Sequence, residues 1–424
     1  MEVFNSFLQI LSATFSQVVF LISMYYLLLS FFGIVRFKKK KQFKAEKSFA
    51  LIVAAHNEEA VIQNIVHSLN MLDYPKELYD ILVIADNCTD STARKARDAG
   101  ANVFERNMKD KRGKGYALEW MFDKIFKMEK KYDSVVIFDA DNLVAKDFLT
   151  EMNNKLCEGY KVVQGYVDVK NPNDNWVTGC NSIAFWTSNR MFQLSRNNLG
   201  LSNQLGGTGF CIDTEILQDL GWGVTCLTED LEFTCKLVSN GYKVGWAHDA
   251  IIYDEKPLTL MQSWAQRKRW MQGFADVSSR YFFKLMKKAI KEFNFVAFDC
   301  ALYTIQPVIL VSSGIAMLIN LSHSFMSAPE LITNAMTMLK TANFNMIKLG
   351  STLLLMLQFI YTPFLLVLEK KFSLRMFLYY LIYPLYSATW LPIAIQGILN
   401  KNKKEWIHTQ HTRSIKIHEL EKAN

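Results

Sequence analysis

This sequence has little of what marks several common classes of protein. Its seven cysteines are odd in number and none lies in a CxxC spacing, so neither a disulfide framework nor a zinc site is indicated. Free thiols in a reducing compartment suit this pattern better. The chain also lacks a nucleic-acid-binding motif, although its formal net charge is +8. Much of that excess lies beside apolar stretches, where anionic lipid heads would attract it, so we expect membrane lipids and no nucleic acid as partners.

Charge is also missing from a long stretch near the N-terminus. Phe7 to Val35 contains no charged residue and exceeds the roughly 20 residues that cross a bilayer core. A cluster of Lys and Arg follows from Arg36 to Lys47, which is the positive flank of a cytoplasmic side. A cleavable signal peptide would carry such charges before the apolar run. We therefore predict a transmembrane helix within residues 1–36, in an integral protein of the cell (plasma) membrane with a cytoplasmic domain.

Apolar residues dominate again in the last part of the chain. We predict transmembrane channel helices across residues 295–400. The spans read from the sequence are Phe295 to Ile319, Ile347 to Leu368 and Met376 to Leu399. Just before them, residues 256–294 mix aromatic residues and Met with many Lys and Arg, as amphipathic helices in a membrane interface do. The chain ends in a basic tail, residues 401–424.

The number of membrane crossings stays open at this point. Four spans would place both chain termini on the outer side, whereas the basic tail favours the cytoplasm. Either one span is missed or one of the apolar stretches lies in the interface. Pro363, Pro384 and Pro392 mark positions at which a helix could break.

The central part of the chain alternates short β-rich runs with longer stretches of helical spacing, from Ser48 to Asp249. This alternation is typical of an α/β domain with a mainly parallel sheet, which we place at residues 45–255. The expected strands are Phe49 to Ala55, Ile81 to Ala85, Asn102 to Phe104, Val135 to Phe138 and Val162 to Val167. The expected helices are Glu58 to Leu72, Thr89 to Ala99 and Tyr116 to Lys130. Ligands bind at the carboxyl ends of strands in such sheets.

Carboxylates follow two of the expected strands. Asp86 closes the run ILVIAD, and Asp139 and Asp141 close VVIFDAD. Two aspartates two residues apart on an exit loop can both reach one divalent cation, Mg2+ or Mn2+, which in turn clamps the oxygens of a diphosphate. A DxD triplet alone is weak evidence, and its place directly after a buried strand strengthens it. Asp86 could equally form an Asx turn or cap the helix that begins near Thr92.

Two further segments combine charge with a backbone suited to ligands. Lys111 to Gly115 reads KRGKG, in which glycines let the backbone approach a ligand and cations neutralise phosphate, although a solvated turn has the same composition. Glu229 and Asp230 lie at an expected helix start, where the positive dipole end keeps Asp ionised and able to act as a general base. The same sequence would also arise if Thr228 were an N-cap followed by acidic residues in the first helical turn.

The segment from Gln266 to Trp270 places an amide, three cations and an indole in one helical stretch. Arg side chains bind phosphate oxygens through paired hydrogen bonds, and a Trp face can stack on a sugar ring. An ordinary basic and aromatic segment beside a membrane would have the same composition. These five residues alone leave both interpretations open.

Taken in order, these motifs resemble those of a known family. Asp86, Asp139 to Asp141, Thr228 to Asp230 and Gln266 to Trp270 resemble the D, DxD, TED and Q(Q/R)xRW series of processive, membrane-embedded family 2 glycosyltransferases. That family includes cellulose synthases, cellulose synthase-like and mixed-linkage β-glucan synthases, hyaluronan synthases and chitin synthases. The likeness runs from about Phe49 to Trp270. It implies a cytoplasmic α/β GT-A domain with a Rossmann-like mixed sheet, plus an α-helical transmembrane region with interfacial amphipathic helices.

The resemblance also implies an inverting transfer and a role for each motif residue. Asp230 would be the catalytic base that takes a proton from the acceptor hydroxyl. The expected substrate-binding residues are Asp86 for the uridine, Lys114 and Gly115 near the nucleotide, Asp139 and Glu229, and Gln266, Arg267 and Arg269 for the diphosphate. Asp139 and Asp141 would hold UDP through Mg2+ or Mn2+, and Trp270 would bind the donor side and stack on the terminal acceptor sugar.

An acceptor loop is implied by one more segment. Gly206 to Cys211 stands where the family has a glycine-containing loop, so Gly207, Thr208 and Gly209 are expected acceptor-binding residues, with a simple turn as the alternative. Near the end of the chain, Trp406 resembles the first residue of the family's W-x-x-T segment, which Thr409 would complete.

The chain departs from the family pattern at two positions. His56 precedes the Asn-Glu pair where many relatives have a Tyr, which leaves the contact to uracil open. Asn142 follows the DxD triplet where some relatives have a His, which leaves a third protein ligand to the metal open.

The resemblance implies a processive enzyme that polymerises a β-linked polysaccharide from a UDP-sugar and secretes it across the membrane. A β-glucan made from UDP-glucose, with 1,4 or mixed 1,3 and 1,4 linkages, is favoured. One alternative is a UDP-GlcNAc-using synthase of the chitin, hyaluronan or poly-GlcNAc type, and another is a non-processive transferase that loads a lipid carrier. A catalytically inactive scaffold is opposed by the intact carboxylates. The expected partners are the UDP-sugar donor, the growing glycan and membrane lipids.

Overall fold

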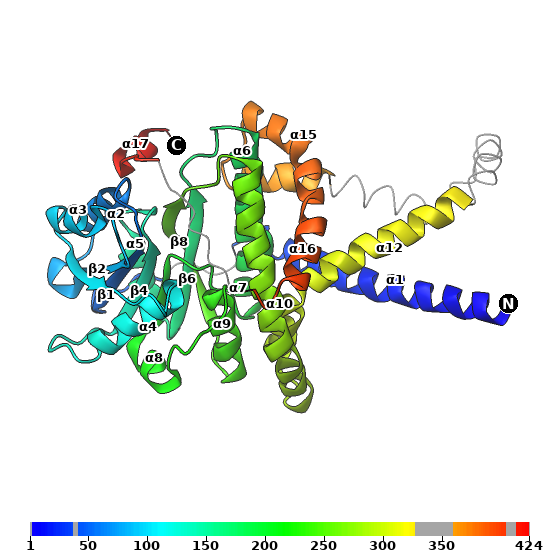
Figure 1. Cartoon of the computed structure of the whole chain (residues 1–424), viewed down its shortest axis with the longest axis horizontal. Helices are drawn as coiled ribbons and strands as arrows, with labels where there is room; N and C mark the ends of the chain where they lie inside the picture. The colour runs from blue at the N-terminus through cyan, green and yellow to red at the C-terminus, as the bar shows by residue number, and fades with distance from the viewer. Residues whose placement is uncertain (1, 37–40, 327–358, 404–412, 424) are drawn as a thin grey trace.

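The computed structural model describes residues 2–36, 41–326, 359–403 and 413–423. Figure 1 shows a globular α/β part from which two long helices project, α1 (Glu2–Phe31) and α12 (Gln306–Met326). These two helices contact each other although almost the whole α/β domain separates them in the sequence. The chain therefore has a globular body and an apolar extension built from both sides of the central domain.

An eight-stranded sheet forms the centre of the body, with the strand order β3-β2-β1-β4-β7-β6-β8-β5. The strands are β1 (Phe49–Ala55), β2 (Tyr79–Asp86), β3 (Asn102–Arg106), β4 (Ser134–Asp139), β5 (Leu143–Val144), β6 (Val162–Val169), β7 (Phe210–Asp213) and β8 (Val244–Asp254). β1 to β4 are mutually parallel, as are β6 and β8. β7 runs antiparallel to β4 and β6, and β5 antiparallel to β8. The sheet is therefore mixed, as expected.

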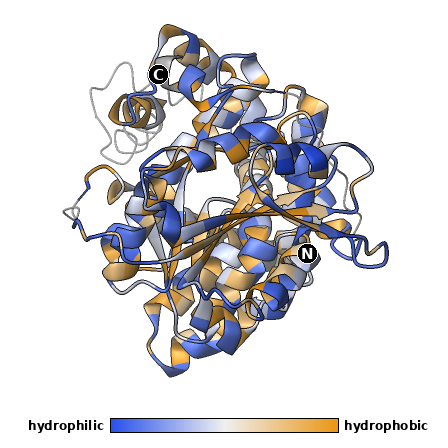
Figure 2. Ribbon diagram, turned by 90° about the vertical axis from the view of Figure 1, so that its left-hand side faces the viewer, coloured by the Kyte–Doolittle hydropathy of each residue, from blue (hydrophilic) through white to orange (hydrophobic). Residues whose placement is uncertain are grey.

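Helices cover both faces of the sheet because successive strand residues are buried on opposite sides. Phe49 and Leu51 of β1 pack on one face with α2, α3 and α5, whereas Ala50 and Ile52 pack on the other with α4, α8 and α9. Figure 2 shows the apolar strands between helices that carry hydrophilic residues. The helices of the body are α2 (Ile62–Asn70), η1 (Lys76–Leu78), α3 (Thr92–Asp98), α4 (Lys114–Ile125), α5 (Phe148–Cys157), α6 (Trp176–Ser188), the π-helical η2 (Asn189–Leu194), α7 (Ser195–Leu199), α8 (Thr214–Leu220) and α9 (Glu229–Ser239).

A single helix, α10 (Leu260–Lys291), fills the range in which several interfacial helices are expected. A capping box starts it, because the side chains of Thr259 and Gln262 each accept a hydrogen bond from the other residue's backbone N–H. No proline follows before Lys291, so nothing divides the helix. α10 packs against α9, α11 (Phe295–Thr304) and α16 (Trp390–Leu399), and it joins the α/β domain to the apolar helices.

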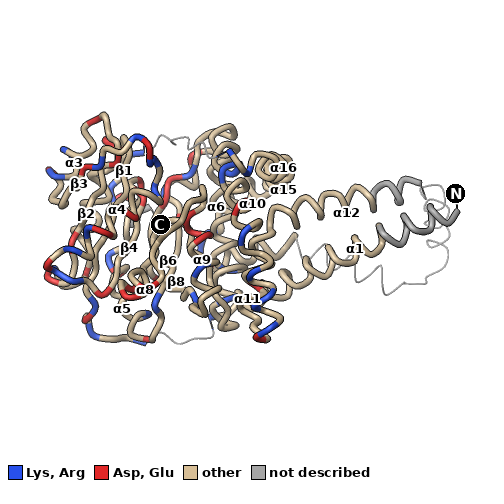
Figure 3. The backbone as a smooth tube through the Cα atoms, turned by 60° about the horizontal axis from the view of Figure 1, so that its bottom comes forward, with Lys and Arg blue, Asp and Glu red and all other residues tan. Residues whose placement is uncertain are grey.

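The expected span from Phe295 to Ile319 is not one straight helix. α11 and α12 meet at Ile305 with a bend of 65°. Pro307 explains the break, because it has no backbone N–H to continue α11, and its place in the first turn of α12 is one where proline is tolerated. By length and composition, the part of the chain that the structure describes holds one helix able to cross a membrane, Ser12–Phe31, or two if the bent pair counts. Figure 3 shows no charged residue along the tan parts of the two projecting helices.

The structure describes the remaining two expected spans only in part or as separate helices. Of Ile347 to Leu368, only Phe359–Leu368 lies within the described residues, where it is helical. The stretch from Met376 to Leu399 is divided at Thr389 into α15 (Leu374–Ala388) and α16, which pack against α6 and α10. Pro392 lies in the first turn of α16, where proline is tolerated because it needs no backbone N–H there. Pro384 lies inside α15, which continues through it. Four continuous spans are therefore not observed among the described residues.

The last described segment returns to the α/β domain. Ile417 and Leu420 of α17 (Ile417–Ala423) are buried against Leu143 of β5. Nδ2 of Asn64 on α2 donates a hydrogen bond of 2.9 Å to Oγ of Ser414. Figure 1 places α17 over the same end of the domain as α2. The end of the predicted basic tail thus packs on the domain, while Trp406 and Thr409 lie outside the described residues.

Candidate active site

One cavity of about 1100 Å³ collects most of the residues singled out in the sequence. It lies at the carboxyl ends of β2 and β4 and the N-terminal ends of α4 and α9, and it extends to α10, α11, α12 and α16. The predicted site residues that line it are Asp86, Lys114, Gly115, Asp139, Asp141, Gly207, Thr208, Glu229, Asp230, Gln266, Arg269 and Trp270. Arg267 and Gly209 are the predicted residues outside this lining. Ligand pockets usually measure about 300–1,000 Å³, so the cavity has room for a nucleotide and a second ligand.

Asp86 ends β2 at the cavity, and its carboxylate is paired with Arg106 at the end of β3. The same guanidinium donates through Nη2 to the carbonyl of Lys111 over 2.7 Å, which ties the KRGKG segment to this pair. Burial raises the pKa of Asp86, and Arg106 opposes that rise. The local turn considered for Asp86 is made by Asp90 instead, because Oδ1 of Asp90 accepts a 3.0 Å hydrogen bond from the backbone N of Thr92. Asp86 is thus left facing the cavity.

Lys114 begins α4 and joins three parts of the site. Its Nζ donates to Oδ1 of Asp139 and, over 2.6 Å, to the carbonyl of Gly207. Burial alone would lower the pKa of Lys114, but the carboxylates around it, Asp139 first and then Glu229, outweigh burial and raise it. Gly113, directly before the helix, has a φ of 115°, a conformation that glycine adopts without strain. The cavity therefore holds a fixed positive charge among acids.

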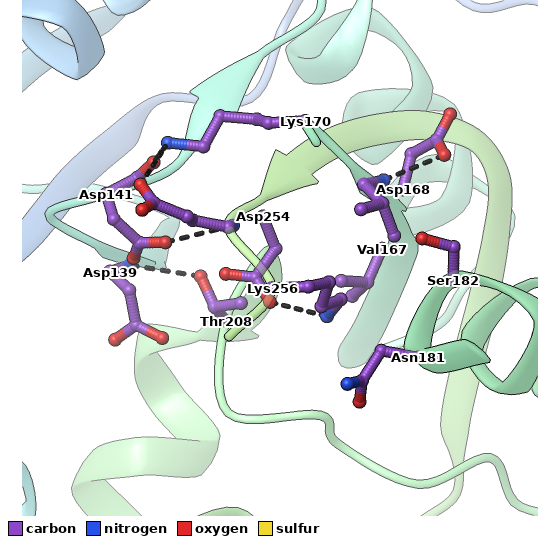
Figure 4. A network of polar contacts seen from close by, with 12 residues as sticks. Asp139, Asp141, Val167, Asp168, Lys170, Asn181, Ser182, Thr208, Asp254 and Lys256 are labelled. Carbon is purple, nitrogen blue, oxygen red and sulfur yellow. Dashed lines mark hydrogen bonds and ion pairs between the residues drawn. The ribbon is translucent and has the colours of Figure 1, made fainter. Parts of the chain in front are cut away.

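Asp139 and Asp141 reach the cavity from the exit of β4, but their carboxylates have different partners. Asp139 is paired with Lys114, whereas Oδ2 of Asp141 accepts a hydrogen bond of 3.1 Å from the backbone N of Glu255. Figure 4 shows the Asp139 carboxylate pointing away from that of Asp141. Across the part of the chain that the structure describes, no group of three or more His, Cys, Asp and Glu side chains could hold a metal ion. The loop itself offers two hard carboxylate ligands, the type that Mg2+ and Mn2+ prefer.

Asn142 acts within the loop rather than as a third ligand. Its Oδ1 accepts hydrogen bonds from Oγ1 of Thr208 and from the backbone N of Asp139. Its Nδ2 donates to Oδ1 of Asp254 over 3.3 Å. The side chain is fully buried and joins the exits of β4 and β8 to the glycine-containing loop. The position where some relatives have a His thus holds the loop together.

The loop from Gly206 to Gly209 is fixed by Gln164 of β6. Nε2 of Gln164 donates to the carbonyl of Thr208 over 2.9 Å, and its Oε1 accepts from the backbone N of Gly206 over 2.8 Å. A Cβ atom on Gly207, whose φ is 79°, would lie 3.5 Å from Oδ2 of Asp230. Gly209 instead packs against β8 and lies outside the cavity lining, so its expected contact to an acceptor is not direct.

Glu229 and Asp230 lie at the start of α9 and face Lys114 across the cavity. The alternative of a capping Thr228 is not observed, because its side chain makes no capping hydrogen bond. Burial raises the pKa of Asp230 to about 7, the Glu229 carboxylate adds to the rise, and Lys114 opposes it. Oδ1 of Asp230 accepts a 2.8 Å hydrogen bond from the backbone N of Leu231. A carboxyl group that titrates near neutral pH suits general base chemistry.

α10 contributes Gln266, Arg269 and Trp270 to the cavity. Burial raises the pKa of Glu229, and the guanidinium of Arg269 opposes that rise, so its positive charge acts on the same acidic pair as Lys114. The Trp270 ring stacks on Trp390 of α16 with centroids 6.4 Å apart and an interplanar angle of 23°. The cationic and the aromatic members of the motif therefore share one end of the site.

Arg267 points elsewhere. Its side chain is fully buried, and Nη1 donates to Oγ1 of Thr389 over 2.8 Å between α15 and α16. The guanidinium carbon lies 4.3 Å from the ring centroid of Tyr386 and 5.0 Å from that of Trp390. The expected direct contact between Arg267 and a diphosphate is therefore not supported by this arrangement, in which Arg267 holds the aromatic wall against α10.

Several residues around the cavity carried no signal in the sequence. Gln164, Tyr303 and Trp390 line it from β6, α11 and α16, and Glu255 lines it just beyond β8. Glu255 follows an apolar run in the same way as the recognised aspartates, so its place after a strand could have marked it. Tyr303 and Trp390 lie in apolar stretches that composition assigns to membrane helices, where single aromatic residues are common.

Comparisons with known proteins agree on one family for this region. Residues 46–273 match the family model described as glycosyltransferase like family 2. The probable glycosyltransferase YdaM of Bacillus subtilis (strain 168) is 28% identical over 265 residues, which cover 60% of this chain and 62% of that protein. A beta-monoglucosyldiacylglycerol synthase of Nostoc sp. is 30% identical over 240 residues, which cover 53% of this chain and 48% of that protein. A poly-beta-1,6-N-acetyl-D-glucosamine synthase of Staphylococcus aureus (strain COL) is 27% identical, with coverages of 57% and 58%.

The similarity thus spans about half to three-fifths of the length of these curated relatives. Among solved structures, the mannosyltransferase PcManGT from Pyrobaculum calidifontis, in complex with GDP-Man and Mn2+, superposes with a TM-score of 0.58 at 18% sequence identity. The match covers 92% of this chain and 97% of that one. At this identity the likeness concerns the fold, and it extends over the α/β body and the helices that follow it.

Proposed function

The chain belongs to glycosyltransferase like family 2, and on that basis we propose that it transfers a sugar from a UDP-sugar to an acceptor hydroxyl with inversion at the anomeric carbon. The observation that carries this proposal is one cavity into which Asp86, Asp139, Asp230 and Trp270 all face. These side chains come from strand ends and helix starts that are far apart in the sequence. Because they line one cavity, a donor and an acceptor bound there would lie close enough to react.

The donor would occupy the end of the cavity between β2 and β4. Asp86, held by Arg106, would accept hydrogen bonds from the uridine. Lys114 and Arg269 would face the diphosphate as cations. Asp139 and Asp141 would hold Mg2+ or Mn2+, which when bound supplies positive charge to the departing diphosphate.

Asp230 would act as the general base. Its carboxylate takes the proton of the acceptor hydroxyl while the hydroxyl oxygen forms the new bond to the anomeric carbon, and the bond from that carbon to UDP breaks. UDP leaves with the bonding electrons, and Lys114 and Arg269 stabilise the negative charge it gains. The pKa of Asp230, about 7, keeps a large fraction of the base ionised at neutral pH.

The product we favour is a β-linked polysaccharide, a β-glucan made from UDP-glucose with 1,4 or mixed 1,3 and 1,4 linkages, made processively and secreted. The support is the aromatic end of the cavity, where Trp270, Trp390 and Tyr303 meet beside the apolar helices. Aromatic faces bind sugar rings without requiring one particular register of the polymer. UDP-GlcNAc is the alternative donor, consistent with the poly-beta-1,6-N-acetyl-D-glucosamine synthase among the relatives.

A second product class, a glycolipid, is favoured by a different observation. Met271, Phe274 and Leu310 line the same end of the cavity from α10 and α12. An apolar wall of this kind suits the alkyl chain of a lipid acceptor, and the beta-monoglucosyldiacylglycerol synthases are among the relatives. In this case the enzyme would transfer one sugar to a lipid rather than extend a polymer.

For location, we propose an integral membrane protein of the cell (plasma) membrane with its α/β domain in the cytoplasm. The apolar helix Ser12–Phe31 and the Lys- and Arg-rich segment after it support this orientation. UDP-sugars are cytoplasmic metabolites in the family that the chain resembles, so the domain would meet its donor there.

Product analysis tests these proposals. Purified protein in detergent is offered radiolabelled UDP-glucose, UDP-GlcNAc and other UDP-sugars with Mn2+ or Mg2+, with and without diacylglycerol. Label in ethanol-insoluble material that linkage-specific glycanases release would support the polysaccharide, and label in the organic phase would support the glycolipid. If no donor released UDP with either metal, with or without diacylglycerol, the proposal that the protein is a glycosyltransferase would be refuted.

A further inference from the structure

The C-terminal segment reaches the surroundings of Asp141 in two ways, by packing on Leu143 and by hydrogen bonding to Glu255, which in turn contacts Asp141. We propose that residues 413–420 hold Asp141 in position, so that the end of the chain is a working part of the proposed metal site. This inference rests on the proposed function, because it assigns to the segment a part in binding the UDP and divalent cation pair. Nothing in the motifs of the sequence points to it, since the segment is short, basic and far from the catalytic motifs.

The first contact lies directly after the aspartates. Ile417 and Leu420 pack on Leu143, and all three side chains are at most 5% exposed. Leu143 is only two residues beyond Asp141 and belongs to β5, which pairs on one side with β8 at the edge of the sheet. A two-residue edge strand is held by few hydrogen bonds. Val144 is fixed by the core and by Ser68 of α2, whereas the side chain of Leu143 is covered by α17.

The second contact reaches Asp141 through Glu255. The backbone N of Arg413 donates to Oε2 of Glu255 over 3.3 Å. The backbone N of Glu255 in turn donates to the Asp141 carboxylate over 3.1 Å. Residues 413–420 thus contact two neighbours of Asp141. They pack on Leu143, which follows it in the sequence, and they hydrogen bond to Glu255, which touches its carboxylate.

Lys170 closes this arrangement from the end of β6. Its Nζ donates to the carbonyl of Asp141 and lies 3.4 Å from Oε2 of Glu255. Figure 4 shows the Lys170 side chain reaching the Asp141 backbone. Lys170, Glu255 and Asp141 are all buried, so the network is shielded from water and each member depends on the others. Partners of this kind, which touch a metal ligand and not the metal, commonly change metal affinity 10- to 100-fold when they are removed.

Two further contacts keep the segment in register. Arg413 forms an ion pair with Asp174, which lies in the loop after β6. Ser414 accepts the hydrogen bond from Asn64 of α2. The segment therefore bridges four separate parts of the domain around the loop, which a tail resting on the surface by chance would not do.

The test separates docking of the segment from metal binding. Leu420→Asp places a carboxylate in the apolar contact and should release the segment, and Ile417→Ala should weaken the contact without adding charge. His418→Asp adds the same charge at an exposed position of the same helix and is the matched control. Hydrogen exchange measures whether residues 413–420 and residues 139–144 open. UDP binding, titrated with Mn2+, measures the metal requirement without turnover.

We expect Leu420→Asp to speed exchange in both regions and to raise the Mn2+ concentration for half-maximal UDP binding about 10- to 100-fold, as removal of such partners does. Ile417→Ala should give a smaller rise, and His418→Asp should behave as wild type. Faster exchange at 413–420 with an unchanged Mn2+ requirement in both variants would overturn the inference, as would unchanged exchange at 139–144. Failure of wild-type protein to bind UDP at any Mn2+ concentration would instead count against the proposed function.

Discussion

Oδ1 of Asp139 accepts a hydrogen bond from Nζ of Lys114, so an ion pair inside the cavity joins the exit of β4 to the first turn of α4. The same lysine charge opposes the rise in pKa of both Glu229 and Asp230. One side chain thus connects the proposed metal-binding loop to the proposed catalytic base. Removal of this side chain should therefore affect both donor binding and the protonation of the catalytic base.

Replacing Lys114 with Gln should move the pH dependence of transfer. Without the lysine charge the pKa of Asp230 rises above about 7, and a base must be ionised to act, so the acid limb of the rate profile shifts to higher pH. The KM for the UDP-sugar should also increase, since a cation facing the diphosphate is lost. Lys127→Gln, at an exposed lysine just beyond α4, is the control. An acid limb that stays in place would exclude Lys114 as a determinant of the base.

Asp230→Asn should reduce transfer by about 10²- to 10⁴-fold while UDP binding is largely retained, because it removes the base and leaves the donor contacts.

The pH dependence of stability offers a second measurement on the same variant. Folding raises the pKa of Asp230 from the ordinary aspartate value of 3.8 to about 7, so the folded state holds the proton more tightly and wild type loses stability as pH increases through that window. The variant has no charge to bury, and its Tm relative to wild type should increase between pH 4 and pH 8. Full-length product from this variant would remove the base assignment.

The two arginines of α10 should behave differently. Arg267→Ala should lower the Tm, because it deletes the buried contacts to Thr389, Tyr386 and Trp390. Arg269→Gln should leave the Tm close to that of wild type and raise the KM for the UDP-sugar. Thermal unfolding and donor titrations on both variants check this. Equal effects of the two substitutions on donor KM, with no loss of stability in Arg267→Ala, would place Arg267 at the diphosphate after all.

Trp270→Ala should shorten or abolish polymer, since the indole would stack on the terminal sugar of the acceptor. UDP binding should change less than chain length. Size-exclusion analysis of the labelled product gives the length directly. Trp264→Phe serves as control, because this tryptophan lies less than two turns earlier on the same helix and outside the cavity lining. Product of unchanged length would remove Trp270 from the acceptor site.

The strands of the first half of the domain could be predicted because parallel strands buried on both faces appear as apolar runs. The predicted ends of β1, β2, β4 and β6 agree with the structure to within two residues for this reason. Those of β3 agree equally well, although this edge strand is mostly exposed or half-buried. β7 and β5 could not be predicted, since β7 has four residues and β5 has two, too few for a pattern. β8 could not be predicted either, because His248 and Asp249 divide its apolar residues into two short runs.

The site residues could be predicted where a regular element leads to them. Asp86 and Asp139 end strands with a clear apolar pattern, and Asp230 lies in the first turn of an expected helix. The position of Arg267 could not be predicted, because a five-residue motif does not say which face of α10 packs against α16. The helix periodicity puts Gln266, Arg269 and Trp270 on one side and turns Arg267 by about 100° relative to Gln266, but only the packing partners decide which side is the cavity.

For a chain that crosses a bilayer, the contact between Leu420 and Leu143 decides whether the number of crossings after the α/β domain is odd or even. If the α/β domain lies on one side, the segment that touches it lies there too, so the stretch between residues 294 and 413 must traverse an even number of times. Three full traverses after the domain, the count implied by the apolar stretches of the sequence, would leave the tail on the opposite surface. α15 and α16, two short helices that pack on α6 and α10, stand where that count assumes one continuous traverse.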